Sequence, residues 1–259
     1  MARPSRSYAA RVIVATLTFL AIWQAVVSLG VVSPVLLPSP LHILGAIEKS
    51  GSDFAAAFLF TLGEIALAVA VTAVFGFSCG AVLGANKSVA KAMAPILSSL
   101  FAVPIIIWYP FFIVFLGIGP ESKVAYAATA GFFPIALYTL TAVQNFDERY
   151  LVLARSLGAT SSQVMFKFVV PLILPMTITG LRIGVSMAVV GVIVTEMLAS
   201  TAGLGFWISY HRTLFNTGEV YLGVILALSF TLMVNIALTR VERRIGRWKA
   251  SEREAAGAL

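Results

Sequence analysis

The sequence predicts an all-α membrane protein with six transmembrane helices, and two observations support that prediction. Hydrophobic residues make up 59% of the 259 residues and charged residues only 11%, whereas a soluble domain carries about 25% charged residues. Six stretches are long and apolar enough to cross a bilayer, which takes about 20 residues. Each should be helical, because a backbone in lipid has to satisfy its own hydrogen bonds.

We expect the spans near residues 12–29, 56–84, 93–116, 123–145, 176–198 and 219–239, in one domain that covers residues 1–259. The first span follows three arginines and resembles a signal peptide in that respect. Its apolar run is longer than the roughly 7–15 residues of a signal-peptide core, and no small-residue cleavage site follows it. We therefore expect an uncleaved helix.

The distribution of Lys and Arg predicts the orientation in the membrane, because cytoplasmic segments carry an excess of both. Placing both termini in the cytoplasm puts fifteen of the eighteen basic residues on the inner side and only Lys49, Lys123 and Arg212 outside. Nucleic acid does not suit this pattern, since the basic residues alternate with long apolar runs and do not cover a soluble face. We expect the basic tail after residue 239 to lie against lipid of the inner leaflet.

Gly76, Gly80 and Gly84 recur every four residues in the second span, which places them on one face of a helix. Small residues at this spacing let two helix backbones approach closely. We expect the row to pack against a helix of the same chain or of a partner subunit. The Lys87 that follows does not complete a nucleotide-binding loop, because the two glycines that this motif requires before its lysine are missing.

Glu64, Arg182 and Glu196 are three ionisable residues in or near the spans. Such residues face protein or water, and they often mark a pathway through the membrane. Both glutamates sit toward the outer end of a span and Arg182 toward the inner end. Snorkelling to the interface or an ion pair is therefore the alternative explanation.

Prolines interrupt the middle spans at Pro104, Pro110 and Pro134, and two aromatic residues stand between the first two. Broken helices are tolerated in a membrane where they line protein or a water-filled cavity. Helix packing with interfacial aromatic residues would explain the same pattern. The candidate pathway residues are Glu64, Trp108, Tyr109 and Glu196.

The two histidines, His42 and His211, lie in different outer segments, and no carboxylate or cysteine cluster stands near them in the sequence. We therefore expect no metal site and no catalytic set of nucleophile and base.

The largest inner segment, residues 147–175, is predicted to form two short helices joined by a turn. The first should stop at Gly158, since glycine readily adopts the left-handed conformation that ends many helices. The second should open at Ser161 and run to Phe168, ending before Pro171. Both helices have apolar residues to bury, so the hairpin suits docking to another protein, with a position on the lipid surface as the alternative.

Residues 154–160 (ARSLGAT), 168–175 (FVVPLILP) and 180–182 (GLR) resemble the EAA loop of binding-protein-dependent ABC importer permeases. Residues 37–40 (LPSP), 117–119 (GIG), 196–200 (EMLAS) and 203–205 (GLG) resemble the nitrate, sulfonate and taurine branch of that family. The resemblance covers about residues 12–248. Two positions depart from the pattern: Val152 stands where the family has an acidic residue, and Glu64 where the branch usually has arginine.

This resemblance implies the type I importer permease fold, with the two helices of the loop seated in a groove of a separate ATPase subunit. The family's motif places the coupling contact at Ala154, Arg155, Ser156, Leu157, Gly158, Ala159, Ser161, Val164 and Phe168.

The resemblance also implies the partners and the location of the chain. It implies a second permease copy in a homodimer, an extracytoplasmic binding protein that selects the solute, and surrounding membrane lipid. No cofactor is expected in this chain, and ATP and Mg²⁺ would bind to the partner ATPase. The location would be the bacterial plasma (inner) membrane, and the substrate a sulfonate, nitrate or other small organic anion.

A self-sufficient secondary transporter or channel is the alternative function. It would use Glu64, Arg182 and Glu196 for coupling, but it leaves the inner hairpin without a role. A membrane enzyme fits less well, because the sequence offers no nucleophile–base set.

The charge distribution gives a first testable prediction. An impermeant thiol reagent added to intact cells should modify Ser50→Cys and leave Ser251→Cys unmodified, because only the first position is expected outside. Labelling of Ser251→Cys in intact cells would contradict the topology.

Overall fold

The computed structural model describes residues 6–147 and 149–256, and every regular element within these ranges is a helix. The expected all-α fold is therefore confirmed. In chain order the elements are α1 (Arg6–Ser28), α2 (Pro40–Gly84), α3 (Lys87–Ala102), η1 (Ile105–Trp108), α4 (Tyr109–Leu116), α5 (Pro120–Gln144), α6 (Arg149–Ser156), α7 (Ser161–Val164), η2 (Met165–Val169), α8 (Val170–Leu198), α9 (Leu204–Thr213) and α10 (Thr217–Ala256).

Four helical stretches of the described chain are long and apolar enough to cross a membrane: 40–84, 120–144, 161–198 and 217–244. Helix α3 together with η1 and α4 meets the same criterion only as a bent pair, which would make a fifth span. The described apolar stretch of α1, Ile13–Ser28, is shorter than these four. The count of six spans stays a prediction.

The stretch expected as the third span, 93–116, is sharply bent. Helix α3 ends at Ala102, and the next helical segment leaves at 84° to it. Val103 between them is extended, with φ −69° and ψ 131°. The proline that follows it explains this, because the ring of Pro104 clashes with a helical conformation at the preceding residue.

Helices extend into two segments that we assigned to loops, so α2 is longer than the span expected within it and the expected end of the second inner helix is wrong. Helix α2 begins at Pro40, well before residue 56, where Ser39 accepts a hydrogen bond from the His42 amide at 3.2 Å and proline occupies the first turn. Both features favour a helix start. The second inner helix also does not end before Pro171. It continues through η2 into α8, so that Ser161–Leu198 is one helical rod.

The continuity at Pro171 has a local cause. The π-helical turn η2 directly precedes it, and the Val170 amide bonds to the Met165 carbonyl five residues back. Proline cannot donate a backbone hydrogen bond and crowds the preceding turn. A wider turn accommodates that ring within a continuous helix, and such single π turns are frequent inside α-helices.

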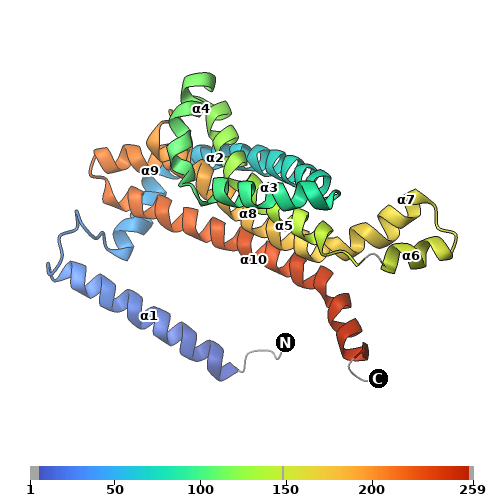
Figure 1. Cartoon of the computed structure of the whole chain (residues 1–259). Helices are drawn as coiled ribbons and strands as arrows, with labels where there is room; N and C mark the ends of the chain where they lie inside the picture. Colours follow the sequence, from blue (N-terminus) through green and yellow to red (C-terminus); the bar gives the residue numbers. More distant parts are fainter. Residues whose placement is uncertain (1–5, 148, 257–259) are drawn as a thin grey trace.

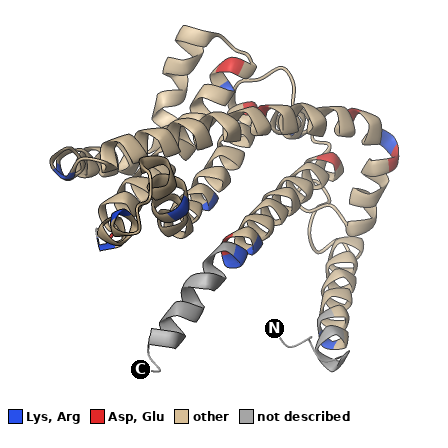
Figure 2. Ribbon diagram, turned by 90° about the vertical axis from the view of Figure 1, so that its right-hand side faces the viewer, with Lys and Arg blue, Asp and Glu red and all other residues tan. Residues whose placement is uncertain are grey.

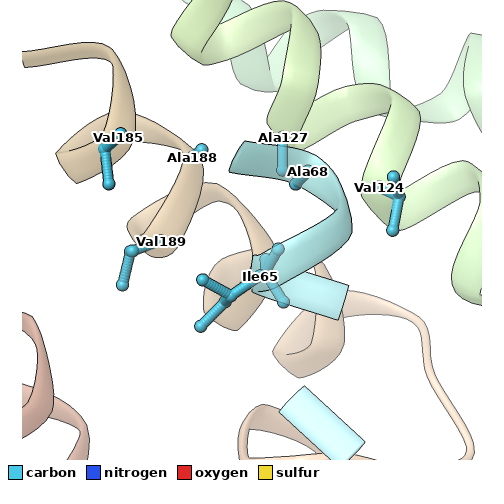
Figure 3. Close-up of a cluster of buried hydrophobic side chains, with 8 residues drawn as sticks. Ile65, Ala68, Val124, Ala127, Val185, Ala188 and Val189 are labelled. Atoms are coloured by element: carbon cyan, nitrogen blue, oxygen red, sulfur yellow. The ribbon is translucent and has the colours of Figure 1, made fainter. Parts of the chain in front are cut away.

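Helix α5 lies at the centre of the molecule, packed against α2 and α8. Ile65 and Ala68 of α2, Val124 and Ala127 of α5, and Val185, Ala188 and Val189 of α8 form one buried cluster (Figure 3). Alanine or glycine at the crossing points lets the backbones come close. A Cβ added to Gly131 of α5 would lie 2.6 Å from the carbonyl oxygen of Gly184 in α8.

The glycine row of α2 faces α5 of the same chain. A Cβ on Gly76 would lie 2.8 Å from Ile135, one on Gly80 2.5 Å from the carbonyl oxygen of Ala136, and one on Gly84 2.8 Å from Val143. The contact is thus within the subunit, which decides between the two possibilities left open by the sequence.

The helical body has two distinct ends. Helices α6 and α7 project at one end, and α9 lies at the other (Figure 1). The first described turn of α1 and the last turns of α10 lie toward the α6–α7 end, while α1 itself stands apart from the body in this view.

The close approach at Gly80 yields a prediction with an internal control. Gly80→Ala should lower the stability of the folded protein by about 1–3 kcal/mol, because the methyl group overpacks the contact with α5. Gly63→Ala on the same helix meets nothing within 4 Å and should be neutral or slightly stabilising. Thermal denaturation of the detergent-solubilised protein, followed by size-exclusion chromatography, measures both. Equal midpoints for the two variants would show that the row is not a packing contact.

Candidate functional site

The hairpin formed by α6 and α7 turns at Gly158, which has a φ of +72°. The Gly158 amide bonds to the Arg155 carbonyl and the Ala159 amide to the Ala154 carbonyl, both at 3.0 Å. This pair of bonds is the Schellman arrangement, which satisfies the last carbonyls of a helix. The left-handed φ is strained for any residue with a side chain, so glycine fits the position.

The second helix of the hairpin starts with a reciprocal cap. The Thr160 hydroxyl accepts from the Gln163 amide at 3.4 Å, and the Gln163 side chain accepts from the Thr160 amide at 2.9 Å. Such a capping box satisfies two amides that the first helical turn leaves free. The two helices are therefore joined by a short turn with a defined geometry.

The hairpin buries little of its own apolar surface. Ala154 and Val164 are buried between its parts, whereas Leu157 and Phe166 remain 72% and 70% exposed. Val152 and Leu153 are also exposed. Exposed apolar side chains along a projecting hairpin and the η2 turn that follows it are typical of a surface that another protein covers.

A buried ion pair joins α2 and α5 at the other end of the body. The Lys123 ammonium lies 2.6 Å from a Glu64 carboxylate oxygen, and their side chains are 2% and 4% exposed. Lys123 also donates to the Ser200 hydroxyl at 2.9 Å and lies 5.0 Å from the centre of the Phe60 ring. In surroundings of low dielectric, such a pair is stable only if both charges keep their partners.

Glu196 ties α8 to the start of α9. Its carboxylate accepts from the Thr61 hydroxyl and from the Gly205 amide, each at 2.8 Å, and Thr61 in turn accepts from the Leu204 amide at 2.7 Å. The first amides of α9 are thereby satisfied by side chains of α2 and α8. A carboxylate at a helix N-terminus is also favoured by the helix dipole.

A cavity of about 510 Å³ lies between η1, α5, α8 and α10. Most of its wall is apolar, and Arg182 is the one basic residue among its described lining residues. The Nε of Arg182 lies 3.1 Å from Glu242, which also accepts from the Thr179 hydroxyl at 2.6 Å. The wall consists of Ile105, Tyr126, Ala130, Arg182, Ile183, Ser186, Met187, Val190, Gly191, Val194 and Asn235.

Residues 72–247 match the family model of the binding-protein-dependent transport system inner membrane component. The chain belongs to this family. It is a permease of an ABC importer, and in such transporters the ATPase activity lies in a separate subunit.

Individual relatives and a solved structure agree with this assignment. The taurine transport system permease protein TauC of Escherichia coli (strain K12) is 29% identical over 236 residues, covering 88% of this chain and 86% of the relative. The formylaminopyrimidine transport permease protein ThiX of Halalkalibacterium halodurans is 31% identical over 220 residues, covering 85% and 88%. A chain of the MetNI methionine ABC transporter in an inward-facing conformation has a similar fold, with a TM-score of 0.62 at 19% identity, covering 77% of this chain and 99% of that one.

The permease brings only some of its sequence-predicted pathway residues together. Glu64 and Glu196 lie in neighbouring buried contacts, and Tyr109 is buried with its hydroxyl 3.0 Å from the Ala199 carbonyl. Trp108 is 42% exposed. None of these four residues lines the cavity between α5, α8 and α10. Glu64 and Glu196 have buried contacts within the chain, and their role in a pathway stays a prediction.

Of the predicted coupling residues, Arg155, Ser156, Leu157, Gly158 and Ser161 are exposed on the hairpin, while Ala159 and Phe168 are half-buried.

Two groups of the permease escaped the sequence analysis. Lys123 was assigned to an outer segment, and it is a buried residue of α5. The sequence did hold an indication of this ion pair, because Lys123 and Glu64 are both expected near the outer end of a span. The polar cavity residues Ser186 and Asn235 also went unnoticed, although Ser186 shares a four-residue spacing with two apolar lining residues of α8.

The ion pair of the permease gives a prediction by double substitution. Lys123→Met should destabilise the folded protein by about 3–5 kcal/mol, because it leaves the Glu64 carboxylate buried without a partner. Glu64→Leu should have a similar effect by isolating the ammonium. The double variant Glu64→Leu/Lys123→Met should be more stable than either single variant. The midpoint of thermal denaturation in detergent measures all three, and strict additivity would show that the two charges do not interact.

Proposed function

We propose that this permease moves a small solute, a sulfonate, nitrate or another small organic anion, which an extracytoplasmic binding protein hands over to it. A separate ATPase subunit, with ATP and Mg²⁺ bound to that subunit, drives the transport. Two identical permease copies form the pathway in the bacterial plasma membrane, with both termini in the cytoplasm. The α6–α7 hairpin is the contact through which the ATPase acts.

The observation that supports this most strongly is the exposed hairpin with its rigid turn. Leu157 and Phe166 present apolar surface at the end of the molecule from which α6 and α7 project (Figure 1). Caps at Gly158 and Thr160 fix the angle between the two helices. A motor subunit can displace such an element as a unit, whereas a flexible loop would absorb the motion.

The continuous rod from α7 to α8 offers a mechanical link from the hairpin to the cavity. Ser161–Leu198 spans 38 residues, or roughly 57 Å at about 1.5 Å per residue. Val164 near its start belongs to the hairpin, Arg182 and Val194 border the cavity, and Glu196 near its end holds α9. A shift at the hairpin would therefore reach the cavity wall and the contacts of α9 along one helix.

The substrate class rests on the relatives and on the cavity. The names of relatives refer to taurine, aliphatic sulfonates and nitrate. Arg182 provides a positive charge in the cavity wall, shared with Glu242. An anion passing through would compete with Glu242 for that guanidinium group. The relatives also include permeases named for formylaminopyrimidine and riboflavin, so the binding protein is expected to make the final selection.

The test compares hairpin variants with a matched surface variant. Leu157→Ala and Phe166→Ala should weaken co-purification of the ATPase subunit and lower substrate-stimulated ATP hydrolysis in proteoliposomes, because both remove exposed apolar contact area. Val82→Ala, which truncates an equally exposed side chain on α2, should leave both unchanged. Gly158→Asp should insert normally and still lose coupling, since it strains the turn at about 1 kcal/mol or more and adds charge.

Two results would overturn the proposal. Full stimulation of ATP hydrolysis in Gly158→Asp would show that the hairpin does not couple ATP hydrolysis to transport. Uptake by the permease alone, in vesicles without the ATPase subunit, would favour the self-sufficient transporter.

A further inference from the structure

Helix α10 carries a strip of seven residues that changes character along its length. Leu232 and Ile236 are apolar and exposed, Asn235 and Thr239 are polar and half-buried, and three arginines follow. All seven border one groove of about 710 Å³, and the described residues that line it belong to α10 alone. The arginines are Arg240, Arg243 and Arg244.

The spacing of these residues places them on one helical face. Leu232, Ile236 and Arg240 follow one another at intervals of four, and so do Asn235, Thr239 and Arg243. Residues four apart are neighbours on a helix surface. From Leu232 to Arg244 the strip covers roughly 18 Å, at about 1.5 Å per residue.

The positive charge of the strip is left without an acidic partner in the described chain. Glu242 is the acidic residue nearest in sequence, and its two carboxylate oxygens are engaged with Arg182 and Thr179 of α8. The described side chains of α10 therefore end in a basic cluster, visible as the blue patch just before the grey C-terminal segment (Figure 2). All seven residues of the strip lie within the membrane-spanning candidate 217–244.

We propose that this strip is a binding site for one anionic phospholipid. The three arginines bind the headgroup phosphate, Thr239 lies at the level of the ester groups, and Leu232 and Ile236 contact an acyl chain, with Asn235 beside Ile236 one turn farther from the arginines. From Leu232 and Ile236 through Thr239 to the arginines, the order apolar, polar, cationic matches the order of groups in a phospholipid. The length of the strip suits one leaflet of a bilayer about 30 Å thick in its hydrocarbon core.

Two features favour a lipid over an acidic protein surface as the occupant. The apolar part of the strip lies within the membrane-spanning candidate, where acyl chains are the neighbouring molecules and a cytosolic partner does not reach. Arginine also binds phosphate oxygens with two donors at once, which fixes a headgroup in place. Basic residues are attracted to any anionic leaflet, but that general attraction does not require a groove or an ordered strip of residues. The groove and the strip therefore indicate a site for one lipid molecule.

The test measures lipid retention by the full chain. Permease purified in detergent is titrated with phosphatidylglycerol or phosphatidylcholine, and the lipid bound per chain is counted by native mass spectrometry. Wild type should hold one phosphatidylglycerol at least about tenfold more tightly than phosphatidylcholine. Arg240→Gln/Arg243→Gln/Arg244→Gln should lose that preference.

A second triple variant, Arg11→Gln/Lys91→Gln/Arg212→Gln, removes the same charge from exposed positions elsewhere and should keep the preference. The single variant Arg243→Gln should give an intermediate value, and it serves if the triple variant does not fold. Unchanged retention in the α10 triple variant, or an equal loss in the control, would overturn the site. If the α10 triple variant co-purified less of the ATPase subunit than wild type while its lipid retention stayed unchanged, this would also overturn the lipid site and identify a protein-docking surface.

Discussion

The close approach of α5 to α2 and α8 is the constraint on which the rest of the structure depends. Inside a bilayer the hydrophobic effect does not hold helices together, because lipid tails are as apolar as the side chains. Contact then relies on backbones that come near enough for dense packing. Gly80 against Ala136 and Gly131 against Gly184 provide that proximity, and the bulkier cluster around Ile65 and Val189 fills the remaining space (Figure 3).

The two ends of the three-helix core carry different chemistry. At the α9 end, the Glu64–Lys123 pair and the contacts of Glu196 tie α2, α5, α8 and α9 together with buried charge. Such contacts are costly to break singly, so this end is expected to move as a unit. At the α6–α7 end the hairpin is held by local caps and leaves Leu157 and Phe166 exposed. The helical rod Ser161–Leu198 connects both ends, and its residue Arg182 borders the cavity.

This arrangement suits a permease that works through partners. A surface that remains apolar and exposed in the isolated chain gains stability when a motor subunit covers it. Glu64 pairs with Lys123 inside the chain, and Glu196 accepts hydrogen bonds from Thr61 and Gly205. The division favours coupling through the hairpin over coupling through Glu64 or Glu196.

The sequence by itself determined the helical class, the membrane location of the apolar stretches, the hairpin with its turn at Gly158, and the family. These follow from local properties: hydropathy over about 20 residues, the left-handed preference of glycine, and short motifs. Only the tertiary structure decided that the row at Gly76 packs within the subunit, that Lys123 pairs with Glu64, and that the helix continues past Pro171. Residue 64 is far from residue 123 in the chain, and hydropathy records how apolar a residue is but not which helix it faces. The partner of a buried charge is therefore fixed by packing, which a single sequence does not display.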